Sequence, residues 1–271
     1  MPIEPSHVDR WLREDLGHHD VTNDVPGDTV GRLVAKESGV VAGLDAATAV
    51  FDRLGVRVED SLDDGSAIKA GEEALRVSGA ASDVLRGERV AVNIVGHASG
   101  VATRTRRAVD AARTVSETVT VAGTRKTTPG LRGIEKRAIA AGGGDTHRLD
   151  LSHMVMIKDN HVAELGVERA IERFRDRASF ASKIEVEAET TETAVAAAKA
   201  GADIVLLDNM TPAETATAVE AVPDSVLTEA SGDITIETLP RYAETGVDVV
   251  SLGSLTHSAP SLDLSFRTGT E

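Results

Sequence analysis

Cationic and hydroxyl side chains are concentrated in residues 124–148, TRKTTPGLRGIEKRAIAAGGGDTHR. The members best suited to binding anions are Thr124, Arg125, Lys126, His147 and Arg148. A guanidinium group binds a carboxylate or phosphate through paired hydrogen bonds, whereas an ammonium group acts as a compact point charge. The segment therefore predicts a binding site for an anionic ligand.

Further polar or small residues follow apolar runs later in the chain. In order, they are Lys158, Glu187, Asp208, Ser231 with Gly232, and Gly253. After a single strand, such a residue is ordinarily a helix cap or half of an ion pair. Repetition after six successive runs, counting the run before Thr124, favours one shared site, because parallel strands of an α/β barrel end at one mouth.

From residue 115 onward these apolar runs alternate with longer amphipathic stretches, which is typical of βα units. Strands are predicted at 118–122, 154–157, 183–188, 203–207, 226–230 and 247–252, and helices at 131–141, 162–177, 190–200, 212–221 and 236–245. Thr211 before Pro212 predicts an N-cap, and Pro240 suggests a later start for the last helix. The pattern predicts an α/β fold with a parallel sheet, wound as a barrel or left open.

The first 102 residues lack this alternation and predict a separate α+β domain. Helices are expected at 6–16, 45–54 and 83–101, and strands at 30–35 and 74–78. Ser6 with Asp9 resembles a capping box at the start of the first helix. We expect one domain over residues 1–104 and a second over 105–262, with the tail 263–271 packed on the first.

Composition excludes several classes of protein. The 271 residues include no Cys, which rules out disulfides, thiolate metal sites and cysteine nucleophiles. No apolar run approaches a membrane span, and the N-terminus lacks the apolar core of a secretory signal, so a cytoplasmic protein is expected. The net charge of −15 disfavours binding to nucleic acid or acidic membranes. Only 7 of 29 cations are Lys, and this acidic composition fits either a high-salt cytoplasm or an ordinary acidic enzyme.

The charge is unevenly distributed along the chain. Residues 86–161 carry 13 Lys and Arg against 7 Asp and Glu, a balance of +6, while the remainder carries −21. Such an inversion in an acidic chain predicts an anionic ligand or an acidic partner subunit.

Five further motifs join the segment 124–148 in resembling one enzyme family. They are MVMIKDNH at 154–161, LLDNM at 206–210, EASGD at 229–233, SLGSLTHSAP at 251–260 and EDLGHHDVTNDV at 14–25. Together with residues 87–105, which resemble an interdomain helix, they make nearly the whole chain similar to the quinolinate phosphoribosyltransferases.

The resemblance implies a fold, a reaction and a set of partners. The fold is an N-terminal α/β sandwich followed by an incomplete α/β barrel. Quinolinate and phosphoribosyl pyrophosphate give nicotinate mononucleotide, pyrophosphate and carbon dioxide, a step of NAD biosynthesis. The implied cofactor is Mg²⁺, with no organic cofactor, and the implied assembly is a homodimer that shares its active sites, with a hexamer left open.

Residue roles are also implied by the resemblance. Quinolinate is expected to be bound by Thr124, Arg125, Lys126, His147, Arg148 and Lys158, with Arg89 supplied by the other subunit. Glu187 and Asp208 are expected to face the ribose hydroxyls and the Mg²⁺, directly or through water. Catalysis is assigned to Lys126, Lys158, Glu187 and Asp208, and either lysine could assist decarboxylation. The 5′-phosphate is expected at Ser231, Gly232, Asp233, Leu252, Gly253, Ser254 and His257.

The chain departs from the family pattern at two positions. Asp233 replaces the second glycine of a Ser-Gly-Gly turn, so we expect it to contribute through its main chain only. Gly123 replaces an acid that would support Arg125.

Two alternatives remain open from the sequence. One is a related phosphoribosyltransferase barrel that acts on another pyridine, and the other is a non-catalytic anion or nucleotide sensor. The first would not need the cluster of Arg125, His147, Arg148 and Lys158, and the second should have lost Glu187 and Asp208.

Overall fold

The computed structural model of the chain describes residues 2–269 and divides into two units that interleave along the sequence. The first unit contains Thr127–Gly143 together with the chain before Arg107 and after Ser254. The second contains Arg107–Lys126 and Gly144–Ser254.

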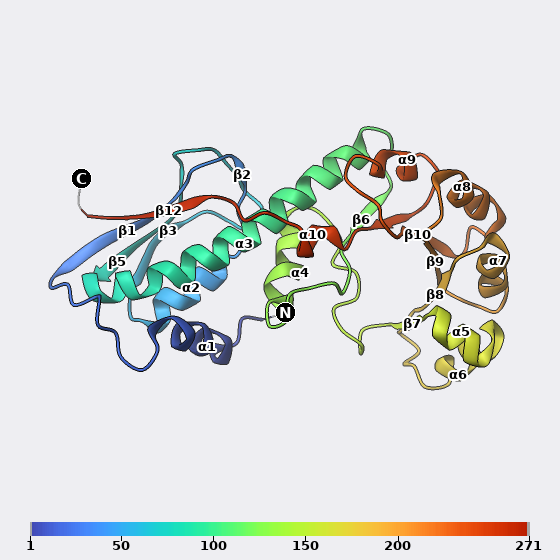
Figure 1. Cartoon of the computed structure of the whole chain (residues 1–271), viewed down its shortest axis with the longest axis horizontal. Helices are drawn as coiled ribbons and strands as arrows, with labels where there is room; N and C mark the ends of the chain where they lie inside the picture. Colours follow the sequence, from blue (N-terminus) through green and yellow to red (C-terminus); the bar gives the residue numbers. More distant parts are fainter. Residues whose placement is uncertain (1, 270–271) are drawn as a thin grey trace. The chain divides into compact units, whose positions relative to one another are not determined.

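An antiparallel sheet forms the base of the first unit. Its strands are β1 (Asp28–Ala35), β3 (Arg57–Ser61), β5 (Glu73–Ala80) and β12 (Leu264–Thr268), in the order β12-β1-β5-β3. Figure 1 shows the C-terminal β12 beside β1, where Leu33 pairs with Phe266. A second antiparallel pair joins β2 (Gly39–Val40) to β4 (Ala67–Ile68). The sequence pattern had indicated only parts of β1 and β5.

Helices supply the remaining layers of this unit. They are α1 (Pro5–Leu16), α2 (Leu44–Arg53), α4 (Arg132–Ala141) and most of α3 (Ala81–Arg113). Leu33, Leu75 and Val77 of the sheet share one core with Phe51 of α2, whose ring stacks on that of Phe266 at 5.9 Å. A second core joins α1, α2, α3 and α4.

Two helix predictions in this unit need correction. Ser6 does not cap α1: Glu4 holds the N-cap position, and Ser6 Oγ donates to Glu4 Oε2 at 3.4 Å. The helix begins at Pro5, because proline suits the first turn and has no N–H to satisfy. Helix α3 continues to Arg113 instead of ending near residue 101, since Gly100 serves close packing there. A Cβ at Gly100 would lie 2.0 Å from the carbonyl oxygen of Pro260.

The second unit contains a six-stranded sheet whose ladders are all parallel. Its strands are β6 (Thr120–Ala122), β7 (Val155–Ile157), β8 (Ile184–Ala188), β9 (Ile204–Asp208), β10 (Leu227–Ser231) and β11 (Val249–Ser251), in the order β6-β11-β10-β9-β8-β7. All six predicted strands are present, and the predicted α/β class is confirmed. Among the described residues no ladder joins β6 to β7, so the sheet stays open there.

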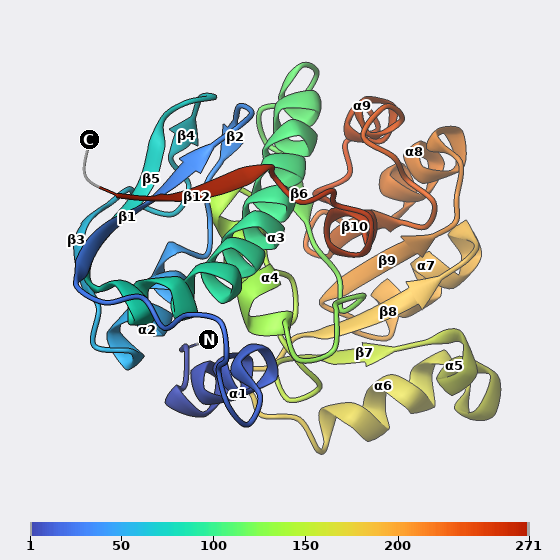
Figure 2. The ribbon, with the colours of Figure 1, turned by 60° about the vertical axis from the view of Figure 1, so that its left-hand side comes forward.

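Helices follow the strands of this unit, and Figure 2 shows several of them against β7, β8 and β9. They are α5 (Asp159–Leu165), α6 (Val167–Arg175), α7 (Thr191–Lys199), α8 (Pro212–Ala221) and α9 (Leu239–Ala243), and the short α10 (Ser254–His257) begins at the unit's end. The single helix predicted at 162–177 is two helices, because the chain turns at Gly166 with φ 75°. Thr211 caps α8 as predicted, and α9 starts late, with Pro240 in its first turn.

No helix within residues 2–269 combines the length and apolarity that crossing a bilayer requires.

Candidate active site

One face of the parallel sheet is mainly apolar, and the other carries ionisable and hydroxyl side chains. Val186, Val205 and Leu207 belong to the core shared with the helices. Because successive side chains of a strand point to opposite faces, the other face, which we call the inner face, carries Glu185, Glu187, Asp208, Glu229 and Ser231. Sequence reasoning identified three of these residues and missed Glu185 and Glu229. Their spacing, two residues before Glu187 and Ser231 respectively, was the signal that could have revealed them.

The carboxyl ends of the strands bring predicted residues to one edge. Asp208 ends β9 and pairs in register with Ser231, which ends β10. Glu187 lies on β8 beside Leu206 of β9, and Lys158 directly follows β7. Figure 2 shows β7, β8, β9 and β10 in the sheet, and each of them carries or precedes one predicted residue at this edge.

An ion pair joins two of these residues. Lys158 Nζ lies 2.6 Å from Glu187 Oε2, with the lysine half-exposed and the glutamate largely buried. Burial raises the pKa of Asp208, and the charge of Glu187 raises it further, while Lys158 and Lys126 oppose the shift. The charges of Glu187, Lys158 and Lys126 thus all act on Asp208, so the four residues expected to be catalytic lie within electrostatic range of one another.

The carboxylates of Glu187 and Asp208 suit a hard cation. Mg²⁺ prefers oxygen ligands and usually keeps several of its waters. The two carboxylates repel each other across a partly desolvated edge, as the raised pKa of Asp208 reflects, and a divalent cation would relieve that repulsion. Because Lys158 already pairs with Glu187, a cation there would compete with the lysine or bind through water.

The pair His147-Arg148 lies over the inner face of the sheet. His147 has a left-handed backbone, with φ 53°. Arg148 is 7% exposed, and its Nη2 lies 2.8 Å from Sδ of Met156, on β7. Burial lowers the pKa of Arg148, and the charge of Arg125 lowers it further, whereas Glu185, Glu229 and Glu187 raise it. Arg148 thus lies within electrostatic range of a second guanidinium group and of three carboxylates, which suits a dianionic ligand.

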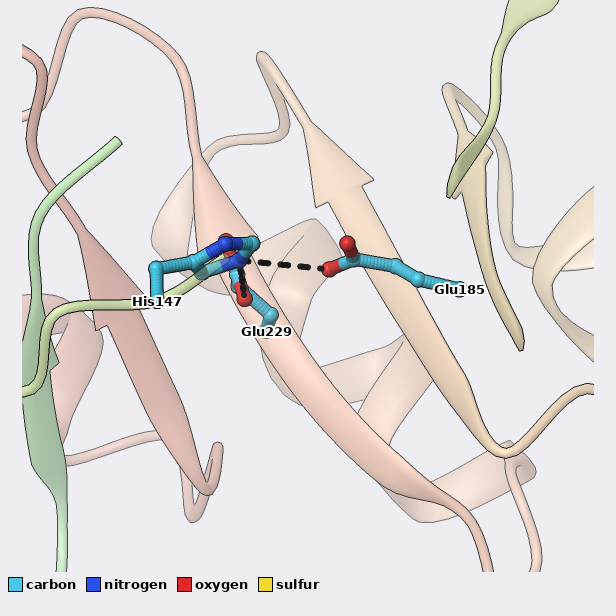
Figure 3. Close-up of side chains that lie close together, drawn as sticks. All are labelled: His147, Glu185 and Glu229. Atoms are coloured by element: carbon cyan, nitrogen blue, oxygen red, sulfur yellow. Dashed lines mark hydrogen bonds and ion pairs between the residues drawn. The ribbon is translucent and has the colours of Figure 1, made fainter. Parts of the chain in front are cut away.

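Figure 3 shows the ring of His147 directed toward Glu229 and Glu185, both of which are buried. Its Nε2 lies 2.9 Å from Glu229 Oε2 and 3.7 Å from Glu185 Oε1. Burial raises the pKa of Glu185 to about 7; the nearby His147 lowers it and the charge of Glu229 raises it. Burial lowers the pKa of His147, but the two carboxylates outweigh it and raise this pKa, which favours a doubly protonated ring. The main-chain N–H of Arg148 opposes that second proton, because it points at Nδ1.

A hydrogen bond at the other ring nitrogen limits what this cluster can hold. The main-chain N–H of Arg148 donates to His147 Nδ1 at 2.8 Å, which leaves no room for a second ring proton and places the proton on Nε2. Potential ligand atoms of His147, Glu185 and Glu229 lie within 4.8 Å of one another. A metal would need the lone pair of Nε2, so this arrangement suits a hydrogen-bonded cluster better than a metal site.

The turn after β10 contains two consecutive residues with a left-handed backbone, Gly232 and Asp233. Gly232 has φ 94°, and a Cβ there would lie 2.2 Å from Asn209 Oδ1, so no larger residue fits. Asp233 follows with φ 47°, in a region that glycine adopts readily. Ser231 Oγ accepts a hydrogen bond from Ser251 Oγ at 3.0 Å. The backbone at Asp233 thus retains the glycine-like conformation that the family pattern places there.

The turn after β11 supplies the other predicted phosphate residues. Ser254 Oγ is buried and has no hydrogen-bond partner among the described residues, which leaves it available to a ligand. The main-chain N–H of Leu252 donates to the carbonyl of Ala122 at 2.9 Å and is already engaged in the sheet.

Three predicted site residues have other local settings. Arg89 lies on α3 in the first unit, exposed and 3.5 Å from Glu88. His257 also belongs to the first unit, where its Nδ1 lies 2.8 Å from Ser258 Oγ. Thr124 Oγ1 accepts the main-chain N–H of Lys126 at 3.0 Å and so shapes the turn after β6.

Comparison with known proteins finds one family over nearly the whole chain. Residues 20–99 match the N-terminal domain of quinolinate phosphoribosyl transferase, and residues 101–267 match its C-terminal domain. A "probable nicotinate-nucleotide pyrophosphorylase [carboxylating]" of Methanothermobacter thermautotrophicus is 44% identical, covering 96% of this chain and 97% of that protein. The human nicotinate-nucleotide pyrophosphorylase [carboxylating] is 45% identical, covering 96% and 90%.

Solved structures agree with these sequence matches. NadC from Streptococcus pyogenes superposes with a TM-score of 0.93 at 37% identity, covering 99% of both chains. The nicotinate-nucleotide pyrophosphorylase from Francisella tularensis superposes with a TM-score of 0.92 at 28% identity, covering 99% of this chain and 98% of that one. Given both domain matches in order and this likeness over the full length, the chain belongs to the quinolinate phosphoribosyl transferase family.

Proposed function

We propose that this protein is a pentosyltransferase that converts quinolinate and phosphoribosyl pyrophosphate into nicotinate mononucleotide, pyrophosphate and carbon dioxide. The observation that carries this proposal is one sheet edge where buried and half-buried cations meet a pair of carboxylates. That combination suits an anionic pyridine and a cation-bound pyrophosphate in one site. The activities named for the nearly full-length relatives support the same reaction.

Quinolinate recognition rests on the cationic side of the site. The pyridine carries two adjacent carboxylates, and planar guanidinium groups can bind each through two hydrogen bonds. The charge of Arg125 lowers the pKa of Arg148, so one dianion could interact with both guanidinium groups. Lys126 and Lys158 add point charges beside Asp208.

Phosphoribosyl transfer rests on Glu187 and Asp208. The pyridine nitrogen attacks the anomeric carbon as pyrophosphate leaves, and positive charge develops on the ribose. Carboxylates fixed beside that charge stabilise the transition state without reorganising. When bound, Mg²⁺ would neutralise charge on the pyrophosphate, and Glu187 and Asp208 would hold it directly or through its waters. Ser231, Gly232, Ser254 and the main chain of Asp233 would bind the 5′-phosphate.

Decarboxylation follows from the same binding geometry. Once ribosylated, the ring nitrogen is cationic and stabilises the electron pair left on the adjacent carbon when carbon dioxide departs. The carbon then takes a proton, which gives nicotinate mononucleotide. Lys126 or Lys158 would assist by orienting the departing carboxylate.

We also infer the setting in which the protein works. A homodimer in which Arg89 enters the neighbouring site would explain why this cation lies in the unit that lacks the parallel sheet. The acidic surface supports a cytoplasmic enzyme adapted to high salt that does not bind nucleic acid. Size-exclusion chromatography with light scattering tests the dimer, and a monomer in active solutions would contradict it.

The reaction is tested by incubating the protein with quinolinate, phosphoribosyl pyrophosphate and Mg²⁺ at 0.1 and 2 M KCl. We expect carbon dioxide and nicotinate mononucleotide in equal amounts. Nicotinate replaces quinolinate in a parallel reaction, and faster turnover of nicotinate would favour a related transferase. Absence of turnover with either pyridine at both salt concentrations would refute the enzyme and leave a non-catalytic sensor.

A further inference from the structure

Both ring nitrogens of His147 are already bound by the protein. The main-chain N–H of Arg148 donates to Nδ1 at 2.8 Å, and Nε2 lies 2.9 Å from Glu229 Oε2. Since a nitrogen that accepts an N–H carries no proton, the ring is the Nε2–H tautomer and donates to Glu229. While these two bonds stand, neither nitrogen can reach a substrate.

The same contacts hold a strained backbone. His147 has φ 53°, which residues other than glycine rarely adopt. Its own N–H donates to Asp145 Oδ1 at 2.6 Å, so the residue is restrained through its main chain and through both ring nitrogens. Strained residues of this kind persist where several contacts fix the same backbone conformation, and they cluster at functional sites.

The restraint on His147 passes directly to Arg148. The N–H that meets Nδ1 is the main-chain N–H of Arg148, a buried residue whose Nη2 contacts Sδ of Met156 on β7. A cation buried there beside Arg125 needs opposite charge close by, and Glu185 and Glu229 supply it from the inner face of the sheet. Both glutamates thus act on Arg148 through charge, and Glu229 also acts on it by orienting the ring of His147.

We propose that Glu229, assisted by Glu185, is a positioning residue of the quinolinate site: it fixes the tautomer and ring orientation of His147, and His147 in turn sets the position of Arg148. This inference rests on the proposed function for the identity of the ligand. It assigns His147 a role through the neighbouring arginine instead of direct contact between its ring nitrogens and the substrate. Glu229 contributes more than Glu185, because only Glu229 is within hydrogen-bonding distance of Nε2.

The first test needs no catalytic turnover. Nitrogen-15 NMR of histidine-labelled protein at pH 7, with the His147→Asn variant to assign the signals, reports the state of each ring nitrogen. We expect Nδ1 of His147 in the range of an unprotonated nitrogen and Nε2 in the range of a protonated one. An imidazolium, or the opposite tautomer, overturns the proposal even if the enzyme is fully active.

The second test separates positioning from general stability. Glu229→Met removes the acceptor, and we expect the KM and Kd for quinolinate to rise about ten- to a hundredfold while the KM for phosphoribosyl pyrophosphate stays within about twofold. Glu229→Gln keeps an acceptor oxygen and should stay within about threefold of the wild type for quinolinate. Glu185→Gln should also stay within about threefold, because Glu185 lies 3.7 Å from Nε2 and makes no hydrogen bond to it.

A matched control is available on the same strand. Thr228 is buried and points to the other face of β10, where it bonds Asp248. Thr228→Val should lower the Tm without changing the quinolinate Kd. The proposal fails if Glu229→Met leaves the quinolinate Kd unchanged, or raises both KM values equally. If the wild type binds quinolinate but does not turn it over, the proposed reaction fails while the tautomer and binding results still decide this inference.

Discussion

At the residue scale, the site balances opposite charges within a small volume. Glu185, Glu187, Asp208 and Glu229 share the inner face of the sheet, where Arg125, Arg148, Lys126 and Lys158 offset them. The ion pair of Lys158 with Glu187 is half-exposed on the lysine side, so it contributes less than about 1 kcal/mol to stability. Its value lies in function, because it holds a cation where anionic substrates are expected.

The Asp208→Asn variant tests the role of the carboxylate in catalysis. We expect kcat to fall about a hundred- to a thousandfold, as when other preorganised electrostatic groups are removed, while the quinolinate Kd stays within about twofold. Steady-state kinetics and calorimetry measure the two quantities. Glu189→Gln is the control, because this exposed carboxylate also influences Asp208 but is not expected to face the substrates. An unchanged kcat in Asp208→Asn would remove the residue from the mechanism.

At the scale of elements, the loops after the strands differ in how strictly they constrain the sequence. After β10, Gly232 is required because Asn209 fills the space that a side chain would occupy. Asp233 tolerates its φ of 47° only at a cost, since a left-handed backbone is unfavourable for a residue with a Cβ. After β9, the side chain of Thr211 caps α8 by accepting the main-chain N–H of Glu214, and the Glu214 carboxylate accepts the main-chain N–H of Thr211. The same edge therefore also carries purely structural contacts.

Asp233→Gly is expected to improve the phosphate turn in two ways. Removing the Cβ from a left-handed position should raise the free energy of unfolding by about 1 kcal/mol, as measured by urea denaturation. Removing the carboxylate should also lower the KM for phosphoribosyl pyrophosphate or leave it unchanged. As a comparison, Asp233→Asn removes the charge but keeps the Cβ, and should affect only the KM. A higher KM in Asp233→Gly would mean that the aspartate side chain itself contributes to binding.

At the scale of the whole molecule, acidity governs both stability and solubility. With a net charge of −15, the excess carboxylates repel one another, and salt screens this repulsion at the surface. Specific carboxylates nevertheless stabilise the fold. Asp20 accepts the main-chain N–H groups of Thr22 and Asn23 and the Nε of Arg86. These hydrogen bonds, the Thr22 N–H first, hold the pKa of Asp20 far below its usual range.

Acid should therefore reveal the contribution of Asp20. A carboxyl group whose pKa is lowered by folding stabilises the fold at pH values above its unfolded pKa, about 3.9, and loses that effect as the pH falls through its folded pKa. We expect the difference in urea midpoint between the wild type and Asp20→Ala to be constant from pH 6 to 5 and to shrink below pH 4. Asp224→Ala, an exposed carboxylate for which no such bond is found among residues 2–269, is the control. A difference that grows in acid would contradict this account.

Salt should raise the thermal stability of the whole protein. Increasing KCl from 0.1 to 2 M is expected to raise the Tm by several degrees, because screening weakens repulsion among the excess carboxylates. Differential scanning calorimetry measures the shift. The same series in a variant with five exposed Glu replaced by Gln, at positions distant from the sheet edge, should show a smaller rise. A falling Tm would argue against adaptation to salt.

The amino-acid sequence alone determined the α/β class, all six parallel strands, the cap at Thr211 and the late start of α9. These features depend on local periodicity and local chemistry, which neighbouring residues specify. The same local view missed β3 and β12, and also the short strands β2 and β4, because two-residue ladders have no periodicity of their own. It also placed the cap of α1 wrongly, since Pro5 rather than Ser6 decides where that helix begins.

The tertiary structure alone decided which polar residues act together. Lys158 and Glu187 are 29 residues apart, and His147 and Glu229 are 82 apart, yet each pair is in hydrogen-bonding contact. Parallel pairing places such residues side by side, and the register of that pairing cannot be read from the sequence of either strand alone. For that reason Lys158, Glu187 and Asp208 could be identified one at a time from the ends of their strands, whereas the buried partners of His147 became visible only when β8, β10 and the segment before Arg148 were brought together.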